Sequence, residues 1–414
     1  MVAVSKPIQS MAERYERPAW VRRINLMGDA VGGAARLVPL DPADLADRAS
    51  ASLGETDFGD FGDAGWRERY RTIVEDADAG DLHAVGRLMT RQELLRSLRT
   101  RLLMARAVRQ RPAIRGERIE APVVVTGPAR SGTTILFELL SLDPALRAPL
   151  AFEALHPAGL PGPADRRLEL SECEQELWAD VQPEFAAMHE LRSDLPVECV
   201  TLNAPGFSGT HWPMVLPLPR YAPDLQADYA FHRSILQVLQ HGAPRRTWLL
   251  KTPSHLATLG LLFATYPDAW VVQTHRDPVK TMPSTVSITS MVRWLRSDAV
   301  DLGLMASVIG TTFGAALLGV IEQRAKGAVP DRFVDVHFQS LIRDPVETIR
   351  AAYEGMGREF GDEHAERIRR YLADKPQGKF GTHRYTAEEW GFDAADLRQR
   401  LRPYVEHYGV ELEE

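Results

Sequence analysis

The chain has 414 residues, of which 44% are hydrophobic and 25% charged, the composition of a soluble globular protein with a large core. Its formal net charge of −7 argues against a bulk nucleic-acid binder, because affinity for a phosphate backbone needs a basic surface. The two cysteines, Cys173 and Cys199, show no metal-ligand spacing. A disulfide between them stays open, but a chain of this size does not need one, so we expect reduced thiols in a cytoplasmic protein.

Residues 1–118 are expected to form a helical N-terminal extension. Met1–Trp20 lacks the apolar run of a signal peptide. Asp81–Arg111 has helical periodicity and many arginines, which is typical of a solvated helix face. No motif in this extension carries recognisable chemistry, and its role stays open.

The pattern changes at Ile119, and residues 119–414 are expected to form one α/β domain. Pro122–Thr126 is a short β-branched run that predicts a strand. A glycine-rich loop follows and leads into an amphipathic helix predicted over Thr133–Leu142. Strand, glycine-rich loop and helix in this order open a nucleotide-binding α/β fold.

A β-α-β crossover is predicted in the middle of the chain. Trp248–Leu250 and Trp270–Thr274 are expected to be buried strands, and Ser254–Thr265 the helix between them, with Ser254 as its N-cap. A crossover of this kind implies parallel strands with helices on both faces. Ligands are then expected beyond the carboxyl ends of the strands.

The C-terminal part continues the alternation of strands and helices. Arg332–Phe338 is predicted as a strand, and a helix is expected from Pro345 to about Met356. Further helices are expected over Glu363–Ala373 and Ala394–Arg402, the second interrupted or ended by Pro403.

One segment, Leu302–Ile321, is uncharged and long enough to cross a bilayer. It contains several glycines and hydroxyl residues, and its flanks are Asp301 and Glu322 rather than basic or aromatic residues. We therefore interpret it as a buried helix of the core. Contact of the protein with a membrane surface stays open.

The loop Gly127–Thr134, with the sequence Gly-Pro-Ala-Arg-Ser-Gly-Thr-Thr, has the two-glycine frame of a P-loop. A nucleoside triphosphatase carries a lysine where this chain has Thr133. The loop amides and the following helix N-terminus can still bind an anion, because they present unpaired N–H groups and the positive end of the helix dipole. No credible metal-binding carboxylate follows an apolar strand, since Asp277 lies between Arg276 and Pro278. The frame alone predicts anion binding without a metal ion and names no donor.

The loop resembles the 5′-phosphosulfate loop of sulfotransferases that use 3′-phosphoadenosine 5′-phosphosulfate (PAPS), whose usual form is Pro-Arg/Lys-Ser-Gly-Thr-Thr. Ala129 replaces the proline of that form. The positions that match are Arg130, Ser131, Gly132, Thr133 and Thr134.

A second signature of that family is a strand followed by Arg-Asp-Pro, with a serine eight residues after the arginine. This chain carries it as Arg276-Asp277-Pro278 and Ser284. A helical turn after a strand can direct both side chains to one phosphate, with the arginine bidentate. The resemblance runs from about residue 119 to residue 392.

The resemblance is to bacterial sulfotransferases with a helical N-terminal extension. It implies a P-loop nucleoside-triphosphatase-like fold, a parallel sheet flanked by helices, with PAPS as donor, adenosine 3′,5′-bisphosphate (PAP) as product and no metal. Arg130 and the amides of Ser131–Thr134 are then expected to hold the 5′-phosphate and sulfate, and Arg276 and Ser284 the 3′-phosphate. Lys379 and His383 are in a loop similar to the family's C-terminal element, which covers the 3′-phosphate.

Sulfuryl transfer resembles phosphoryl transfer, so the enzyme needs cations around the sulfate and a base for the acceptor's proton. Lys251 corresponds to the lysine that relatives place on the leaving bridging oxygen. Glu153, nine residues after the helix-ending Pro144, matches the base of one branch of the family. His255 lies four residues after Lys251, whereas another branch has its histidine two residues after the lysine. Both candidates for the base stay open.

The acceptor is expected to be the hydroxyl of a small aromatic, sugar or lipid-like molecule. Its pocket is expected to involve Pro205–Trp212 and Met282–Trp294, with the apolar side chains Phe207, Trp212, Met291 and Trp294. The composition does not predict an oligomeric state.

Two other classes of function are alternatives. A P-loop kinase or nucleoside triphosphatase would need Mg²⁺ and a lysine at position 133. A non-enzymatic module would bind adenosine bisphosphate or lie on a membrane. The charged residues Arg130, Lys251 and Arg276, together with Ser284, favour an enzyme.

Overall fold

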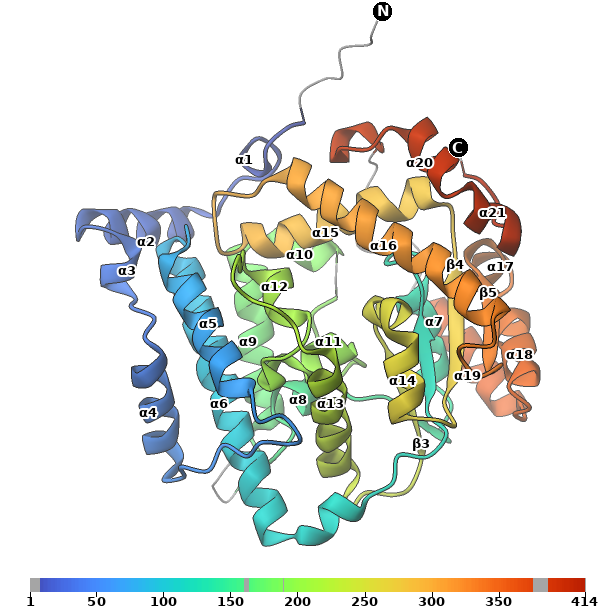
Figure 1. The fold of residues 1–414 in the computed structure, drawn as a ribbon, viewed down its shortest axis with the longest axis horizontal. Helices are drawn as coiled ribbons and strands as arrows, with labels where there is room; N and C mark the ends of the chain where they lie inside the picture. Colours follow the sequence, from blue (N-terminus) through green and yellow to red (C-terminus); the bar gives the residue numbers. More distant parts are fainter. Residues whose placement is uncertain (1–7, 160–163, 189, 375–385, 414) are drawn as a thin grey trace, which may run out of the picture.

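The computed structural model describes residues 8–159, 164–188, 190–374 and 386–413. Its centre is a five-stranded sheet with the order β2-β3-β1-β4-β5 (Figure 1). All four strand pairs are parallel, and helices cover the sheet, as the sequence predicts. The strands are β1 (Val123–Thr126), β2 (Leu146–Arg147), β3 (Thr247–Lys251), β4 (Trp270–His275) and β5 (Phe333–His337).

Strand β1 lies in the middle of the sheet, and its four residues are buried. A parallel strand covered on both faces needs a continuous apolar run, which explains the three consecutive valines. Val125 of β1 is paired with Lys251, the last residue of β3, and Thr126 with Gln273 of β4. The register therefore brings the end of β3 beside the start of the glycine-rich loop.

The predicted crossover is present with one change in its helix. A 3₁₀ turn, η3 (Pro253–Thr258), precedes the α-helix α14 (Leu259–Thr265). Thr252 is the residue that flanks the turn, so the prediction of Ser254 as N-cap was wrong. Pro253 explains the shift, because proline favours the first position of a helical segment.

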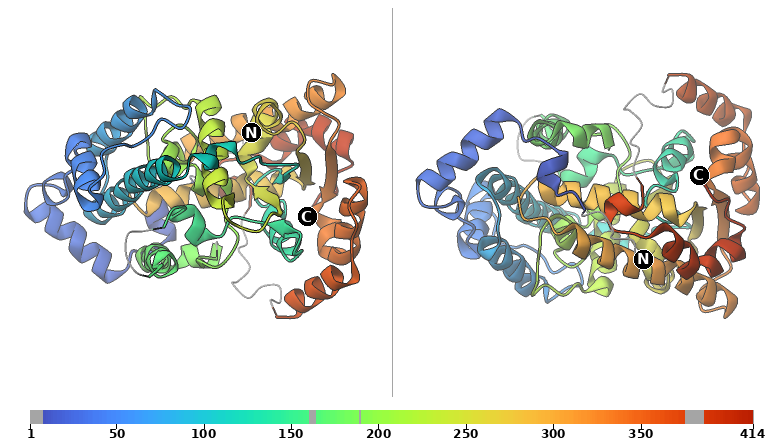
Figure 2. Two further views of the ribbon diagram at one scale, coloured as in Figure 1. Left: turned by 90° about the horizontal axis from the view of Figure 1, so that it is seen from below. Right: turned by 90° about the horizontal axis from the view of Figure 1, so that it is seen from above.

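The first 118 residues form helices, as expected, and they pack against the rest of the chain. They are α1 (Met11–Arg14), α2 (Ala19–Ala30), α3 (Ala34–Leu37), α4 (Pro42–Leu53), α5 (Trp66–Ala79), α6 (Ala84–Gln110) and η1 (Pro112–Gly116). One hydrophobic cluster includes Ile73 and Leu98 from these helices together with Val124 and Leu250 from the sheet. In Figure 2, helices α2–α6 lie at one end of the molecule and α18 and α19 at the other.

The prediction of a solvated arginine face on α6 was wrong for several positions. Arg87 and Arg101 are buried. Arg101 donates to the carbonyl oxygens of Pro205 at 3.1 Å and Gly59 at 2.7 Å, and its guanidinium lies 3.9 Å from the centre of the Trp66 ring. A guanidinium has five donors and a flat apolar face, so backbone carbonyls and an aromatic ring can satisfy it inside a core.

The remaining helices follow β1 and β4 in the chain. Between β1 and β4 they are α7 (Thr133–Ser141), α8 (Ala151–Leu155), α9 (Arg167–Val181), α10 (Pro183–Met188), α11 (Cys199–Leu202), η2 (Ala204–Gly206), α12 (His211–Val215) and α13 (Leu225–Gln240). After β4 they are α15 (Pro278–Trp294), α16 (Leu302–Ala325), α17 (Phe338–Arg343), α18 (Pro345–Gly355), α19 (Asp362–Asp374), η4 (Glu388–Trp390), α20 (Ala394–Arg400) and α21 (Arg402–Tyr408).

Two sequence predictions in this region change. Pro403 does not end a helix that runs to Arg402, because α20 ends at Arg400 and Pro403 lies in the first turn of α21. Among the described residues, α16 is the one helix that is long and apolar enough to cross a membrane, judged by length and composition. Its interpretation as a buried helix holds for one face only, since Leu304 and Val308 are exposed.

Candidate active site at the carboxyl edge of the sheet

The glycine-rich loop between β1 and α7 packs closely against β4 and α17. Gly127 has φ 143°, and a Cβ there would lie 2.2 Å from Oγ1 of Thr274 on β4. Gly132 has φ 88°, and a Cβ there would lie 2.9 Å from the Phe338 ring. Both glycines are therefore required by left-handed backbone and by close packing.

Some side chains of the loop are buried and others are exposed. Ser131 and Thr133 are buried, and Ser131 Oγ donates to the Pro128 carbonyl at 2.6 Å. Arg130 and Thr134 are exposed. Arg130 also has a positive φ of 68°. An anion in this loop would meet the side chains of Arg130 and Thr134 and the amides at the start of α7.

Lys251 reaches the loop from the end of β3. Its side chain is 2% exposed, and Nζ donates to Oγ1 of Thr134 at 3.1 Å. Nζ also forms an ion pair with Glu198, whose other carboxylate oxygen accepts from Oγ1 of Thr252 at 3.5 Å. The predicted lysine and the predicted loop are thus in direct contact.

Glu198 is one of two residues beside the predicted site that the sequence did not reveal. It precedes α11, its side chain is 23% exposed, and it lies 53 positions from Lys251 in the chain. No motif surrounds it, and no periodic pattern distinguishes it from other acids. Only its position beside Lys251 in three dimensions indicates a role.

Arg276 follows β4 and is tied to the same loop. Its Nη1 donates to the Arg130 carbonyl at 2.9 Å, and its guanidinium lies 3.8 Å from the centre of the Phe338 ring. Its Nε and Nη2 donate to the two carboxylate oxygens of Glu413 at 2.7 and 2.8 Å. The Arg276 guanidinium, which is predicted to bind a phosphate, therefore binds the carboxylate of Glu413 in this structure.

The C-terminal segment that supplies Glu413 is itself anchored. The Glu413 backbone N–H donates to Oδ2 of Asp277 at 2.9 Å, and its carbonyl accepts from Arg398 Nη2 at 2.9 Å. Oδ1 of Asp277 accepts from the Val279 amide at 2.9 Å and caps α15. Ser284 lies on the second turn of α15 and is 4% exposed. Lys379 and His383 lie outside the described residues.

The carboxylate of Glu153 makes structural contacts with both of its oxygens. One carboxylate oxygen accepts from Arg147 Nη2 at 2.8 Å, and the other accepts from the Leu150 amide at 3.1 Å. Glu153 thereby caps the start of α8. It lines a cavity of about 420 Å³ that also includes Arg147 and Tyr371. No described contact joins it to Lys251 or to the loop.

His255 lies in the core. It is 4% exposed, and its Nδ1 is 2.7 Å from the Tyr229 hydroxyl. Burial, with a smaller contribution from His232, lowers the pKa of His255 to about 3. The described contacts of this ring are with Tyr229 and His232 and not with the loop.

The side chains expected to line the acceptor pocket pack inside the protein instead. Phe207 and Trp212 are stacked with ring centres 5.7 Å apart, and both are buried. Met291 and Trp294 are buried as well. These side chains are part of one hydrophobic cluster. Apolar residues at such positions contribute to stability through packing.

A family model described as "Sulfotransferase family" matches residues 122–362, more than half of the chain. The chain is 24% identical over 318 residues to the omega-hydroxy-beta-dihydromenaquinone-9 sulfotransferase Stf3 of Mycobacterium bovis. That match covers 70% of this chain and 76% of Stf3. The Mycobacterium tuberculosis protein of the same name matches to the same extent.

Two solved structures are similar over most of the chain. Sulfotransferase STF9 from Mycobacterium avium has a TM-score of 0.78 and 26% identity, covering 90% of this chain and 97% of that one. Sulfotransferase STF1 from Mycobacterium tuberculosis H37Rv has a TM-score of 0.69 and 28% identity, covering 87% and 98%. At 90% coverage of this chain, the similarity to STF9 extends into the helical N-terminal region.

Proposed function

Because the chain belongs to the sulfotransferase family, we propose that it transfers a sulfuryl group from PAPS to a hydroxyl at the carboxyl edge of the sheet. The observation that supports this proposal is the contact between Lys251 and Thr134, in which a buried lysine lies beside the glycine-rich loop. Arg276, bonded to the backbone of the same loop, supplies a second cation.

The donor would lie across the loop and the end of β4. Its 5′-phosphosulfate would be bound by the amides at the start of α7, by Arg130 and by the hydroxyl of Thr134. Its 3′-phosphate would bind to the Arg276 guanidinium, which already binds the two oxygens of a carboxylate. A bidentate guanidinium suits phosphate and carboxylate alike. The Glu413 carboxylate must then leave the Arg276 guanidinium before the donor binds.

Lys251 would act on the bridging oxygen. In an in-line displacement the acceptor oxygen forms a bond to sulfur while the bond from sulfur to the bridging oxygen breaks, and negative charge grows on that oxygen. Once Lys251 is directed at the donor, its charge stabilises the charge that grows on this oxygen. Its burial strengthens the effect, because water screens the charge less.

We propose Glu198 as the base that takes the acceptor's proton, ahead of Glu153 and His255. Glu198 is paired with Lys251 and remains partly exposed, so an acceptor can approach it. When Lys251 turns to the donor, the carboxylate of Glu198 loses its cation and becomes a better proton acceptor. Glu153 is engaged by Arg147 and the start of α8, and His255 is enclosed in the core.

For the acceptor we propose a lipid-like alcohol. The relatives from Mycobacterium bovis and Mycobacterium tuberculosis are named for a hydroxylated dihydromenaquinone, which is such a molecule. The chain matches these relatives over 70% of its length, but at 24% identity the class of acceptor is a better inference than the individual compound.

The test is calorimetric titration with PAP, with and without Mg²⁺, on the wild type and on Arg276→Ala. We expect binding that does not depend on the metal and that weakens by about 2–5 kcal/mol in the variant, because a buried charge pair contributes that much. Arg71→Ala, a change at an exposed arginine of α5, is the matched control and should leave binding unchanged.

Turnover is then measured with labelled PAPS and long-chain alcohols as acceptors. Transfer of label to an alcohol would support both the donor and the acceptor class. Failure to bind PAP, or binding of ATP only together with Mg²⁺, would overturn the assignment of PAPS as donor.

A further inference from the structure

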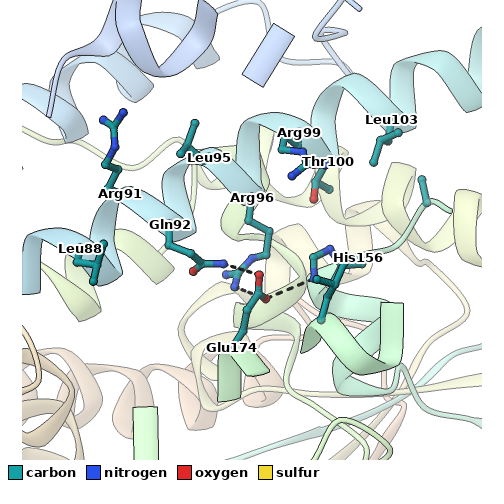
Figure 3. A pocket seen from close by; sticks show the side chains of 12 residues that line it. Leu88, Arg91, Gln92, Leu95, Arg96, Arg99, Thr100, Leu103, His156 and Glu174 are labelled. Carbon is teal, nitrogen blue, oxygen red and sulfur yellow. Dashed lines mark hydrogen bonds and ion pairs between the residues drawn. The ribbon is translucent and has the colours of Figure 1, made fainter. Parts of the chain in front are cut away.

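A groove runs along one side of helix α6, and it shares no lining residue with the glycine-rich loop, Lys251 or Arg276. Its volume is about 330 Å³, within the size range of sites for small molecules. One wall is a strip of α6 from Leu88 to Leu103 (Figure 3). At 1.5 Å per residue this strip is about 22 Å long. The opposite wall consists of α9 and of the segment that follows α8.

Two of the arginines that line the groove are neutralised by the protein. Arg91 Nη2 lies 3.0 Å from Asp44 on α4. Arg96 Nη1 lies 2.9 Å from Glu174 on α9, and Nε2 of His156 lies 3.4 Å from the same carboxylate. Figure 3 shows Glu174 joined by dashed lines to Gln92, Arg96 and His156. Neither arginine therefore has an uncompensated charge to offer a ligand.

Arg99 differs from both. It lines the same groove and is partly buried, and its Nε is buried without a hydrogen-bond partner. Across the described residues, no hydrogen bond or ion pair of Arg99 is found. Leu160–Pro163, which lie outside those residues, include no acidic side chain. A guanidinium with a buried nitrogen that lacks a partner is unfavourable, so an anion bound here would be stabilised.

The rest of the strip is suited to an apolar chain. Leu88, Leu95 and Leu103 alternate with the arginines along the groove. At the α2 end Leu88 is 45% exposed, and on α2 itself Leu26 and Met27 are 65% and 59% exposed. The groove therefore leads from an isolated cation towards an exposed apolar surface.

From this arrangement we propose that the groove binds one extended anionic amphiphile, with its head group at Arg99 and its chain directed towards Leu88. The distance along α6 between these two residues is about 16 Å. One uncompensated guanidinium matches one negative charge, so the head is a carboxylate or a sulfate ester. This inference does not depend on the identity of the sulfuryl donor.

Calorimetry with dodecanoate, decyl sulfate and the neutral dodecanol, each below its micelle concentration, tests the proposal. We expect the wild type to bind at least one of the two anions and to bind dodecanol more weakly. The anion with the higher affinity then identifies the head group. Arg99→Gln should weaken anion binding by about tenfold or more, since a charge-assisted hydrogen bond contributes roughly 1.5–3 kcal/mol. Arg71→Gln, at an exposed position on α5, is the charge-matched control.

A second variant tests the groove itself. Leu95→Trp should fill the groove and abolish binding of both anions while Arg99 is retained. Urea unfolding of each variant reports whether it is folded, and PAP titration reports separately on the donor site, so failure of this inference is distinguishable from failure of the donor assignment. The proposal is overturned if the wild type binds neither anion, or if Arg99→Gln or Leu95→Trp binds them as the wild type does.

Discussion

Glu413 and Arg276 lie 137 positions apart in the chain and form a bidentate ion pair, with Nε to Oε1 at 2.7 Å and Nη2 to Oε2 at 2.8 Å. Both side chains are mostly buried, at 20% and 16% exposure. Under the proposed function, this carboxylate competes with the donor's 3′-phosphate for the Arg276 guanidinium.

Replacing Glu413 by Gln should therefore raise the affinity for PAP. The neutral amide cannot compete as a charged acceptor, and the difference of about 1.5 kcal/mol corresponds to roughly a tenfold change. Calorimetry measures it, with Glu411→Gln as control, because Glu411 lies 3.7 Å from Arg343 in an exposed pair. Equal or weaker binding by Glu413→Gln would show that the pair does not obstruct the donor.

Glu198→Gln and Glu153→Gln should separate catalysis from stability. If Glu198 is the base, its variant loses about 10²–10⁴ in kcat, and the acid limb of its pH–rate profile disappears. Glu153→Gln should keep kcat within a few-fold and lose about 1–2 kcal/mol of stability, because it weakens a helix cap and an ion pair. Steady-state kinetics and urea unfolding of both variants give the comparison, and the opposite pattern would return the role of base to Glu153.

Glu93→Gln should destabilise the protein strongly. Glu93 accepts from Arg296 Nη2 at 2.6 Å and from Trp178 Nε1 at 3.1 Å, and both members of the ion pair are almost fully buried. Removing the acid leaves Arg296 charged and unpaired, which costs about 3–5 kcal/mol. Urea unfolding measures the loss against Glu68→Gln, an exposed glutamate of α5. A loss below about 1 kcal/mol would mean that water reaches Arg296.

Stability should fall as the pH drops below about 6.5. Burial lowers the pKa of His211 and His255 to about 3, and burial lowers the pKa of His83 and His232 to about 4. The unfolded chain therefore binds protons at these histidines between pH 6.5 and pH 4 while the folded protein does not. Asp228 acts in the opposite direction, since burial raises its pKa to about 7 and the folded state holds that proton.

The balance of these five groups gives the expected slope. Four histidines outweigh one aspartate, so unfolding near pH 5 should take up about three protons. The slope of the unfolding free energy against pH, from urea titrations between pH 7 and pH 5, measures this number. A slope near zero would show that the histidines titrate normally in the folded protein.

The parallel sheet and the family were predictable because their signals are local. Three valines before a two-glycine loop, and an Arg-Asp-Pro turn after a second apolar strand, are each contained in fewer than a dozen residues. The structure confirms the sheet and its helices, and the family match confirms the resemblance. The assignments of Arg130, Lys251, Arg276 and Ser284 to the donor remain predictions.

Glu198 and Glu413 could not be found in the same way. Each is linked to the site only by a contact with a residue far along the chain. Glu198 contacts Lys251, and Glu413 contacts Arg276. The contacts of the arginines on α6 could not be predicted from the sequence for the same reason. Their spacing indicates a helix, but it does not reveal that backbone carbonyls and an aromatic ring satisfy Arg101 inside the protein.

The close packing of Gly127 on Thr274 and of Gly132 on Phe338 has a consequence for the catalytic cycle. A loop packed this closely against β4 and α17 has little room to change shape. Under the proposed function, the free energy needed to shape the loop is therefore supplied when the chain folds and is not drawn from the affinity for each donor molecule.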